Sequence, residues 1–412
     1  MRSDLSASGV FAMLGLGCAV GAELLDAPSA GNFVRRDAAR ATVLGDYVYV
    51  DGGELSQLVD GKISSYRSSN QVNSTLSIDI SKSWTTSDLV IRTIPRPSPA
   101  KANVALWTDT AAGVFYSWGG KYPFGLNMVK DALWKFTPDG GGGGAWSKEE
   151  PTNPTLFTAL HPSEQGVSAY TNDTGILIGG LATGWTELYR GHTQTLPGMV
   201  TFNMKTKVWQ NGTTGFSPFP TLVGASAHYV PSFGPHGLVL VFGGHTPPVV
   251  GLPDLPTAPF VDLRNLTLFD PETKERYWQM ATGSIPPTPR SFFCVTGCQN
   301  PAGGYEIFLF GGQNQRDRFN YDDAYILSLP GFVWTKLPDT PAGRRRGATC
   351  VPVGKRQVLT IGGIDGDWRS ADPAPQGLQL FDMTAMRWTD AYDANAAAYE
   401  QADVIKRWYS SG

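Results

Sequence analysis

The stretch LVLVFGGH (238–245) contains four aliphatic residues, a phenylalanine, two glycines and a histidine. A short apolar run that stops at glycine is typical of a buried β-strand. Glycines directly after a strand permit positive φ angles and a close approach of the backbone to its neighbours. The stretch therefore predicts a buried strand with a sharp exit. It leaves open whether His245 begins a loop that binds a ligand.

The same pattern occurs six times along the chain. Each copy is short, rich in β-branched and aromatic residues, and ends in a glycine pair. A unit that recurs in this way indicates either blades or a solenoid. The six runs are YVYVDGG (47–53), GVFYSWGG (113–120), GILIGG (175–180), LVLVFGG (238–244), EIFLFGG (306–312) and QVLTIGG (357–363).

Further strand-like segments flank each glycine pair. A second segment follows the pair, and several of these continue through a turn to a tryptophan, as FNMKTKVW does to Trp209. A third segment precedes each glycine-ending run and often carries a basic residue near its start. Examples are Arg40, His228 and the cluster Arg344–Arg346. About four short strands per unit favour the blades of a propeller.

Together, the apolar strand, Gly-Gly, variable loop, aromatic-rich strand, turn and tryptophan resemble the Kelch repeat. The resemblance covers nearly the whole chain and extends to secreted fungal Kelch-repeat proteins with a galactose oxidase-like fold. It implies an all-β, six-bladed Kelch-type β-propeller with four antiparallel strands per blade. Either residues 24–36 or the tail after Trp388 would supply the last strand of the ring. We expect the propeller over 23–400, a tail over 401–412, and blades near 35–95, 96–155, 156–218, 219–285, 286–340 and 341–400.

The N-terminus predicts a signal peptide over residues 1–22. A short apolar run, VFAMLGLGCAV (10–20), precedes small residues suited to cleavage after Ala22. The alternative is an uncleaved, disordered leader. No later apolar run is long enough for a membrane helix, so we expect a secreted or secretory-pathway protein without a membrane span. Four Asn-X-Ser/Thr sequons fit this route as N-glycosylation sites: Asn73, Asn172, Asn211 and Asn265.

The cysteines and the net charge limit the disulfides and the partners that the protein can have. Once Cys18 leaves with the signal peptide, Cys294, Cys298 and Cys350 remain. At most one disulfide can then form within the chain, and its pairing stays open. The net charge of −3 and the pI near 6.0 provide no general basic surface. We therefore expect no nucleic-acid partner.

The loops after the glycine pairs would share one face around the central channel. This polar and aromatic collection is the expected place for a binding site, although ordinary solvated loops are an equal alternative. A structural role is favoured for the arginines of 344–346, with anion binding as the alternative. The binding candidates are His192, His245, Arg316, Arg318, Trp368, Arg290 and Arg345.

No metal or other cofactor is expected, and copper or iron is kept as the alternative. The five histidines show no fixed spacing of a metal site. The galactose oxidase-like resemblance concerns the fold and does not extend to the copper ligands of that enzyme.

Two functions remain open, because a fold does not determine a function. The first is a secreted or secretory-pathway propeller that binds a protein or a carbohydrate. The second is an enzyme or accessory protein of fungal (secondary) metabolism, with a site for a small-molecule metabolite at the channel mouth, including an oxidase-like metal site. No catalytic motif decides whether the protein is an enzyme. The oligomeric state also stays open.

Overall fold

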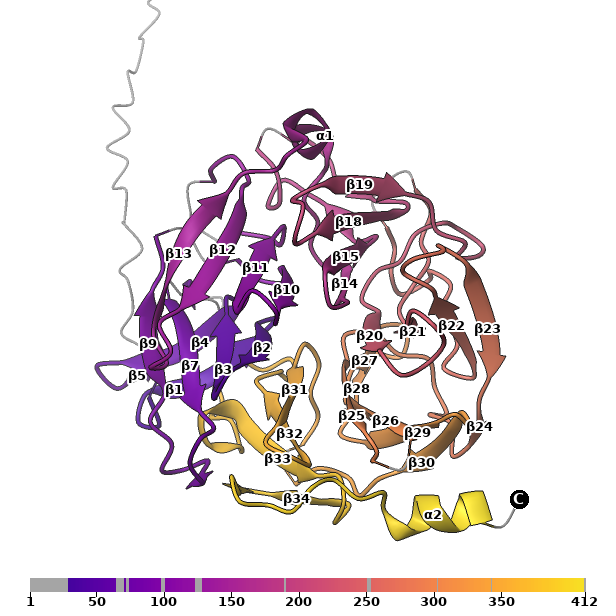
Figure 1. The fold of residues 1–412 in the computed structure, drawn as a ribbon. Coiled ribbons are helices and arrows are strands. Elements are labelled where there is room, and N and C mark those ends of the chain that lie inside the picture. The colour runs from indigo at the N-terminus through magenta and orange to yellow at the C-terminus, as the bar shows by residue number, and fades with distance from the viewer. Residues whose placement is uncertain are drawn as a thin grey trace, which may run out of the picture.

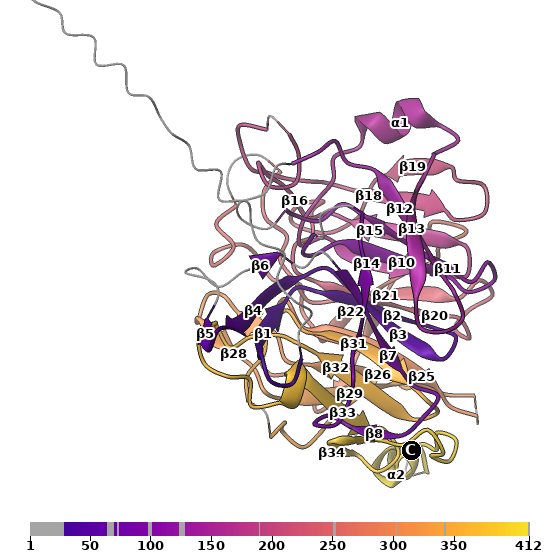
Figure 2. The same cartoon turned by 90° about the vertical axis from the view of Figure 1, so that its left-hand side faces the viewer.

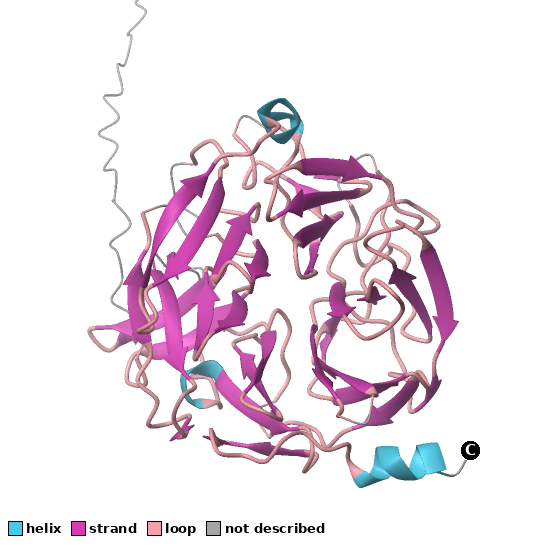
Figure 3. Cartoon of the chain, in the orientation of Figure 1, coloured by secondary structure: helices cyan, strands magenta, loops and turns pink. Residues whose placement is uncertain are grey.

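The structure of the chain is a computed structural model. It describes residues 29–63, 70–71, 74–97, 101–122, 128–188, 190–249, 253–301, 303–341 and 343–410. The expected signal peptide (1–22) and the sequon at Asn73 lie outside the described residues. Strands dominate the described chain, and the two α-helices lie at its periphery (Figure 3). None of the helices in these ranges has the length and apolarity to cross a membrane.

Six antiparallel sheets of the same plan follow one another along the chain, each with its four strands paired in sequence order. Sheet 1 contains β2 (Arg40–Leu44), β3 (Tyr47–Asp51), β7 (Ser74–Asp79) and β9 (Arg92–Pro95). Sheet 2 contains β10 (Ala105–Asp109), β11 (Val114–Trp118), β12 (Leu133–Pro138) and β13 (Gly144–Glu149). Sheet 3 contains β14 (Val167–Tyr170), β15 (Thr174–Ile178), β18 (Met199–Asn203) and β19 (Trp209–Gly212).

The second half of the chain repeats this plan. Sheet 4 contains β20 (Ser226–Val230), β21 (Leu238–Phe242), β22 (Asn265–Phe269) and β23 (Arg276–Met280). Sheet 5 contains β25 (Cys294–Gln299), β26 (Tyr305–Phe310), β29 (Ala324–Leu329) and β30 (Val333–Lys336), with β24 (Thr282–Gly283) added in parallel. Sheet 6 contains β31 (Thr349–Val353), β32 (Gln357–Ile361), β33 (Leu378–Asp382) and β34 (Arg387–Thr389).

Short elements decorate these sheets. Figure 2 shows β4, β5, β6, β16 and β28, which follow glycine pairs, on one side of the molecule. The short strands are β1 (Phe33–Asp37), β4 (Glu54–Val59), β5 (Lys62–Ile63), β6 (Asn70–Gln71), β8 (Trp84–Thr85), β16 (Leu181–Ala182), β17 (Gln194–Thr195), β27 (Gln313–Asn314), β28 (Phe319–Asn320) and β35 (Ala391–Tyr392). The helices are α1 (Pro154–Ala159), α2 (Asp403–Ser410) and the 3-10 turn Pro375–Gly377.

The first strands of the six sheets surround the centre of the molecule (Figure 1). In the order β2, β10, β14, β20, β25 and β31, each contacts the next, and β31 contacts β2. The strand contacts therefore form a closed cycle, which an open stack of repeats would lack.

A ring of backbone hydrogen bonds lies just before these strands. The residue at this position has a φ between 56° and 71° in all six sheets. In five of the six sheets its N–H donates to the equivalent carbonyl of the preceding sheet, for example Asn103 to Ala38 (2.9 Å) and Phe292 to Gly224 (2.7 Å). The bond from Ala38 to the Gly347 carbonyl (3.0 Å) joins sheet 1 to sheet 6. We call Ala38, Asn103, Gln165, Gly224, Phe292 and Gly347 the backbone ring.

The glycine pairs join neighbouring sheets as well as ending strands. All twelve glycines have positive φ, as the sequence predicts. The N–H of Gly244 donates to the Arg290 carbonyl, just ahead of the next sheet, at 2.9 Å. A Cβ on Gly243 would lie 2.6 Å from that same carbonyl oxygen. Glycine is therefore required both by the backbone conformation and by the space available.

The core is divided among the interfaces between sheets. Six of the apolar clusters each lie between two neighbouring sheets. Val239 and Val241 of β21 pack toward sheet 3, whereas Leu240 and Phe242 pack toward sheet 5. Both faces of β21 are thus buried, and this burial explains why LVLVF is apolar at every position instead of alternating.

The ring closes differently from the sequence expectation. Each sheet takes its four strands from one continuous stretch, so among the described residues no terminal segment adds a strand to sheet 1 or sheet 6. The tail instead forms a short ladder, β35, with β8 beside sheet 1. Tyr392 of β35 donates a hydrogen bond to the Ile80 carbonyl (2.8 Å) and lies against Trp84. The closure thus relies on packing and not on strand exchange.

Candidate functional site in the central channel

A cavity of about 440 Å³ lies along the centre of the strand cycle. All six sheets contribute to its wall, and five of the six backbone-ring residues also line it. The first strands pair with a neighbour on one side only, so their free backbone edges face this space. A volume of this size falls in the usual range of small-molecule sites.

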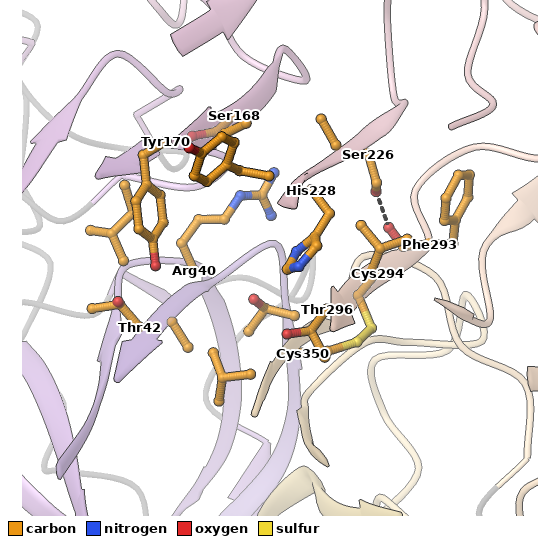
Figure 4. Close-up of a pocket in the computed structure, with 18 of the residues that line it drawn as sticks. Arg40, Thr42, Ser168, Tyr170, Ser226, His228, Phe293, Cys294, Thr296 and Cys350 are labelled. Atoms are coloured by element: carbon orange, nitrogen blue, oxygen red, sulfur yellow. Dashed lines mark hydrogen bonds between the residues drawn. A yellow bond between two sulfur atoms is a disulfide. The ribbon is translucent and has the colours of Figure 1, made fainter. Parts of the chain in front are cut away.

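Polar and aromatic side chains share this wall with aliphatic ones such as Leu106 and Val351. Hydroxyl groups come from Thr42, Ser168, Thr296 and Thr349, and an amide comes from Gln165. No aspartate, glutamate or lysine is among the described lining residues. The site therefore offers mainly neutral hydrogen-bonding groups, and Figure 4 shows Thr42, Ser168 and Thr296 among them.

His228 and Tyr305 form a close pair of polar side chains in the wall. The Nε2 atom of His228 lies 2.6 Å from the Tyr305 hydroxyl. Burial lowers the pKa of His228 to about 4, so its imidazole is neutral at pH 7. A Cβ on Gly297 would overlap the Tyr305 ring and lie 2.8 Å from His228 Nε2. Glycine at this strand position thus makes room for the pair.

Arg40 begins β2, two residues after Ala38 of the backbone ring. Its Nη1 donates to the Ala39 carbonyl at 3.2 Å. Burial lowers the pKa of this guanidinium. Figure 4 shows the side chain pointing into the cavity that Ser168 and His228 also line.

A disulfide joins two neighbouring first strands in the cavity wall. Cys294 of β25 is bonded to Cys350 of β31, with their Cα atoms 5.6 Å apart. This pairing answers the question that the sequence left open. Cys298 is a free thiol, and burial raises its pKa to about 12. The thiol therefore stays protonated at neutral pH and is a poor nucleophile.

Arg290 and Arg345 each bind a carboxylate and a glycine-pair carbonyl within their own sheet. Arg290 is fully buried, pairs with Asp323, and donates to the Gly311 carbonyl of its own glycine pair at 3.2 Å. Arg345 pairs in the same way with Asp372 and donates to the Gly362 carbonyl at 3.1 Å. This geometry supports the structural role that the sequence favours for Arg345, and Arg290, predicted as a binding residue, has the same kind of contacts.

His245 is packed away from the channel cavity. Its side chain is fully buried, and its ring centroid lies 4.0 Å from that of Phe260. Its backbone bridges Val223 and Phe260. Burial lowers the pKa of His245 to about 4, which keeps the imidazole neutral at pH 7.

The other loop candidates do not line one common cavity. His192 and Arg318 are exposed. Arg316, also exposed, lies 5.7 Å from the centre of the Phe260 ring. Trp368 is half-buried, and its carbonyl accepts a hydrogen bond from Ser56 (2.9 Å). None of the seven predicted binding residues lines the channel cavity. Within the described ranges, no group of three or more His, Cys, Asp or Glu side chains could hold a metal ion.

The residues that the loop hypothesis missed come from the segments before the glycine-ending runs. Arg40 and His228 are visible there as polar residues in otherwise small, apolar strands. Their position on the first strand of a sheet was the available signal. The described sequons, Asn172, Asn211 and Asn265, are exposed, and Asn172 also lines the cavity.

No protein-family model matches the chain. It is 22% identical over 409 residues to a Kelch repeat-containing protein of Arthroderma benhamiae (strain ATCC MYA-4681 / CBS 112371), a match that covers 87% of the chain. The chain spans 57% of the length of that relative. The Kelch resemblance is therefore confirmed as distant homology to a fungal Kelch repeat-containing protein.

Proposed function

We propose that the protein is a six-bladed Kelch propeller of the secretory pathway that binds a carbohydrate in its central channel. The observation that carries this proposal is the 440 Å³ cavity with its wall of hydroxyl, amide and aromatic groups. The six like sheets and the closed cycle of first strands support the propeller. Function then depends on the site and not on the fold.

The wall chemistry favours a sugar over an apolar metabolite. Sugars present many hydroxyl groups, which match the free strand edges and the side chains of Ser168 and Thr296. Their C–H faces pack against aromatic rings, and Tyr170 lines the cavity with 37% of its surface exposed. A buried apolar ligand would leave these polar groups without partners, at a cost in free energy.

The secretory route has separate support. A disulfide joins Cys294 to Cys350, and disulfides persist mainly in oxidising compartments. The described sequons are exposed and thus accessible for glycosylation. The N-terminal apolar run has the composition of a signal peptide.

The test is a calorimetric binding screen of the secreted protein against monosaccharides and disaccharides. We expect at least one saturable ligand, whose affinity falls by about tenfold or more in Tyr170→Ala because an aromatic contact is lost. Trp278→Ala is the matched control, since Trp278 is a 61% exposed aromatic residue on the outer strand β23. Binding that Tyr170→Ala leaves unchanged, or binding of a protein partner alone, would contradict the proposal.

A further inference from the structure

We propose that the ligand of the channel carries an anionic group, a carboxylate or a phosphate, and that Arg40 binds it. This inference rests on the proposed carbohydrate-binding function and deepens it by naming the class of sugar. The ligand would be a sugar acid or a sugar phosphate rather than a neutral sugar. The argument comes from the charges and the unpartnered polar atoms of the cavity wall.

Arg40 is the only side chain of the described cavity wall that is charged at neutral pH. The wall contains no lysine, aspartate or glutamate, and burial keeps His228 neutral. Asp37 is the carboxylate whose charge acts on Arg40, but it pairs with Arg346 at 3.4 Å. Within the described chain, Arg40 itself forms no salt bridge of 4.0 Å or less.

Other buried arginines of this protein have carboxylate partners. Arg96 binds Asp51, and Arg290 and Arg345 bind aspartates in the same manner. Arg36 also lacks a salt bridge in the described chain, but the void it lines measures only about 10 Å³. Arg40 therefore combines an unpaired charge with a space large enough for a ligand.

The chemistry of an unpaired guanidinium indicates what would bind there. A guanidinium has five N–H donors, and the Ala39 carbonyl accepts from one of them. Keeping such a cation away from water without a partner is costly. A carboxylate or phosphate matches its planar fork through two parallel hydrogen bonds. A ligand with this group would thus satisfy donors that the protein leaves open.

Two further polar atoms in the wall point to hydroxyl groups on the same ligand. The Ser168 hydroxyl and Gln165 Oε1 are both buried without a hydrogen-bond partner, and both residues line the cavity. Ser168 can donate to an anionic oxygen, whereas Oε1 of Gln165 can only accept, for instance from a sugar hydroxyl. The combination of one cation, one hydroxyl and one acceptor fits an anion that also carries hydroxyl groups.

The experiment compares matched sugars that differ only in the group at C6, which is neutral, a carboxylate or a phosphate. Isothermal titration is run with a panel of uronic acids, the corresponding sugar 6-phosphates and the corresponding neutral sugars. We expect at least one anionic probe to bind about tenfold or more tightly than its neutral counterpart. The uronate and phosphate arms distinguish the two sources of negative charge.

Two variants of the same residue identify the group responsible. Arg40→Met should remove the preference for the anion, so that the anionic and the neutral sugar bind this variant with similar affinity. Arg40→Lys keeps the positive charge and should retain part of the preference. Arg387→Met, at an exposed arginine of β34, is the control and should behave as wild type. Circular dichroism and a thermal melt confirm that each variant is folded.

The outcomes separate this inference from the proposed function. Equal binding of neutral and anionic sugars, or an anion preference that survives in a folded Arg40→Met variant, overturns the role of Arg40 and leaves the carbohydrate site intact. Failure of every sugar in the panel overturns the proposed function, and the inference falls with it. A preference lost in Arg40→Met and partly kept in Arg40→Lys supports both.

Discussion

Gly243 and Gly45 have nearly the same backbone conformation in different surroundings. Their φ angles are +55° and +60°. A Cβ on Gly243 would lie 2.6 Å from the Arg290 carbonyl oxygen, whereas a Cβ on Gly45 would meet nothing within 4 Å. We expect Gly45→Ala to lower the free energy of unfolding by about 1 kcal/mol, because alanine disfavours the left-handed conformation. Gly243→Ala should lower the free energy of unfolding by roughly 3 kcal/mol or more, because the backbone must also move to make room for the Cβ.

Urea unfolding of the two alanine variants measures this difference. Equal losses would mean that the glycine pair is needed only for its φ angle. A larger loss at Gly243, and a still larger one in Gly243→Val, would show that the pair is needed for the contact between sheets.

His228 should make the stability of the protein depend on pH in the acid range. Its pKa is about 4 in the folded chain against an ordinary value of 6.5, because burial disfavours the charged imidazole. Between these pH values the unfolded chain binds the proton and the folded chain does not. Stability is therefore full above pH 6.5 and falls as the pH drops toward 4, by at most about 3 kcal/mol from this residue.

The measurement is urea unfolding of wild type and His228→Gln at pH 7.5 and pH 4.5. The variant cannot titrate and should lose less stability between the two pH values. His192→Gln, at an exposed histidine, serves as the control and should follow the wild type. Identical pH dependence in His228→Gln and wild type would exclude His228 as a source of the acid sensitivity.

For single residues, the sequence predicts the conformation of the glycine pairs better than it predicts which residues line the cavity. A repeated glycine pair is a local signal, since positive φ belongs to the residue itself. The burial of His245 depends on Phe260, which lies fifteen residues later in a Pro-rich insert. The position of Arg40 on the cavity wall depends on how six sheets meet around an axis, and a linear pattern does not contain that geometry.

Among the elements, the disulfide between β25 and β31 is a bond between neighbouring sheets. Its two cysteines are 56 residues apart in sequence. Closing a loop of that length in the unfolded chain is expected to stabilise the fold by about 4 kcal/mol. We expect the double variant Cys294→Ala/Cys350→Ala to lose approximately this amount in urea unfolding. Cys298→Ala, which removes a partly buried free thiol, should cost roughly 1 kcal/mol.

Reduction provides an independent check on the same bond. Dithiothreitol should lower the unfolding midpoint of the wild type and of Cys298→Ala, and it should not affect the double variant. If dithiothreitol leaves the unfolding midpoint of the wild type unchanged even after the protein is unfolded and refolded in its presence, the disulfide is contradicted. The sequence left this pairing open because β25 and β31 become neighbours only through the packing of sheet 5 on sheet 6.

For the whole molecule, the six sheets could be predicted because each is built locally. Strands of one sheet follow one another in sequence, so the repeat length and the apolar runs indicate them directly. The manner of closure could not be predicted in this way. The expected terminal strand is absent from sheets 1 and 6 in the described chain, and the two ends meet instead through Tyr392, the Ala38–Gly347 hydrogen bond and a shared apolar cluster.

Tyr392→Ala tests whether this closure stabilises the whole ring. Only 2% of the Tyr392 surface is exposed. Its hydroxyl binds the Ile80 carbonyl and its ring packs on Trp84, so the side chain connects the tail to sheet 1. We expect the variant to lose roughly 3–5 kcal/mol, the usual cost of truncating a large buried side chain. Tyr277→Ala, at a 43% exposed tyrosine of the outer strand β23, is the control and should stay within about 0.5 kcal/mol of wild type.

Hydrogen exchange locates the effect of that variant. In a closed ring every sheet has two neighbours, so loosening one joint removes support from sheets on both sides. Amide exchange in β15 of sheet 3, far from Tyr392 in the strand cycle, should then accelerate together with exchange in β32 of sheet 6. An open array of repeats would instead lose protection in its terminal sheets alone. Acceleration confined to sheets 1 and 6 would therefore mean that the contacts between the chain ends are too weak to make the six sheets unfold as one unit.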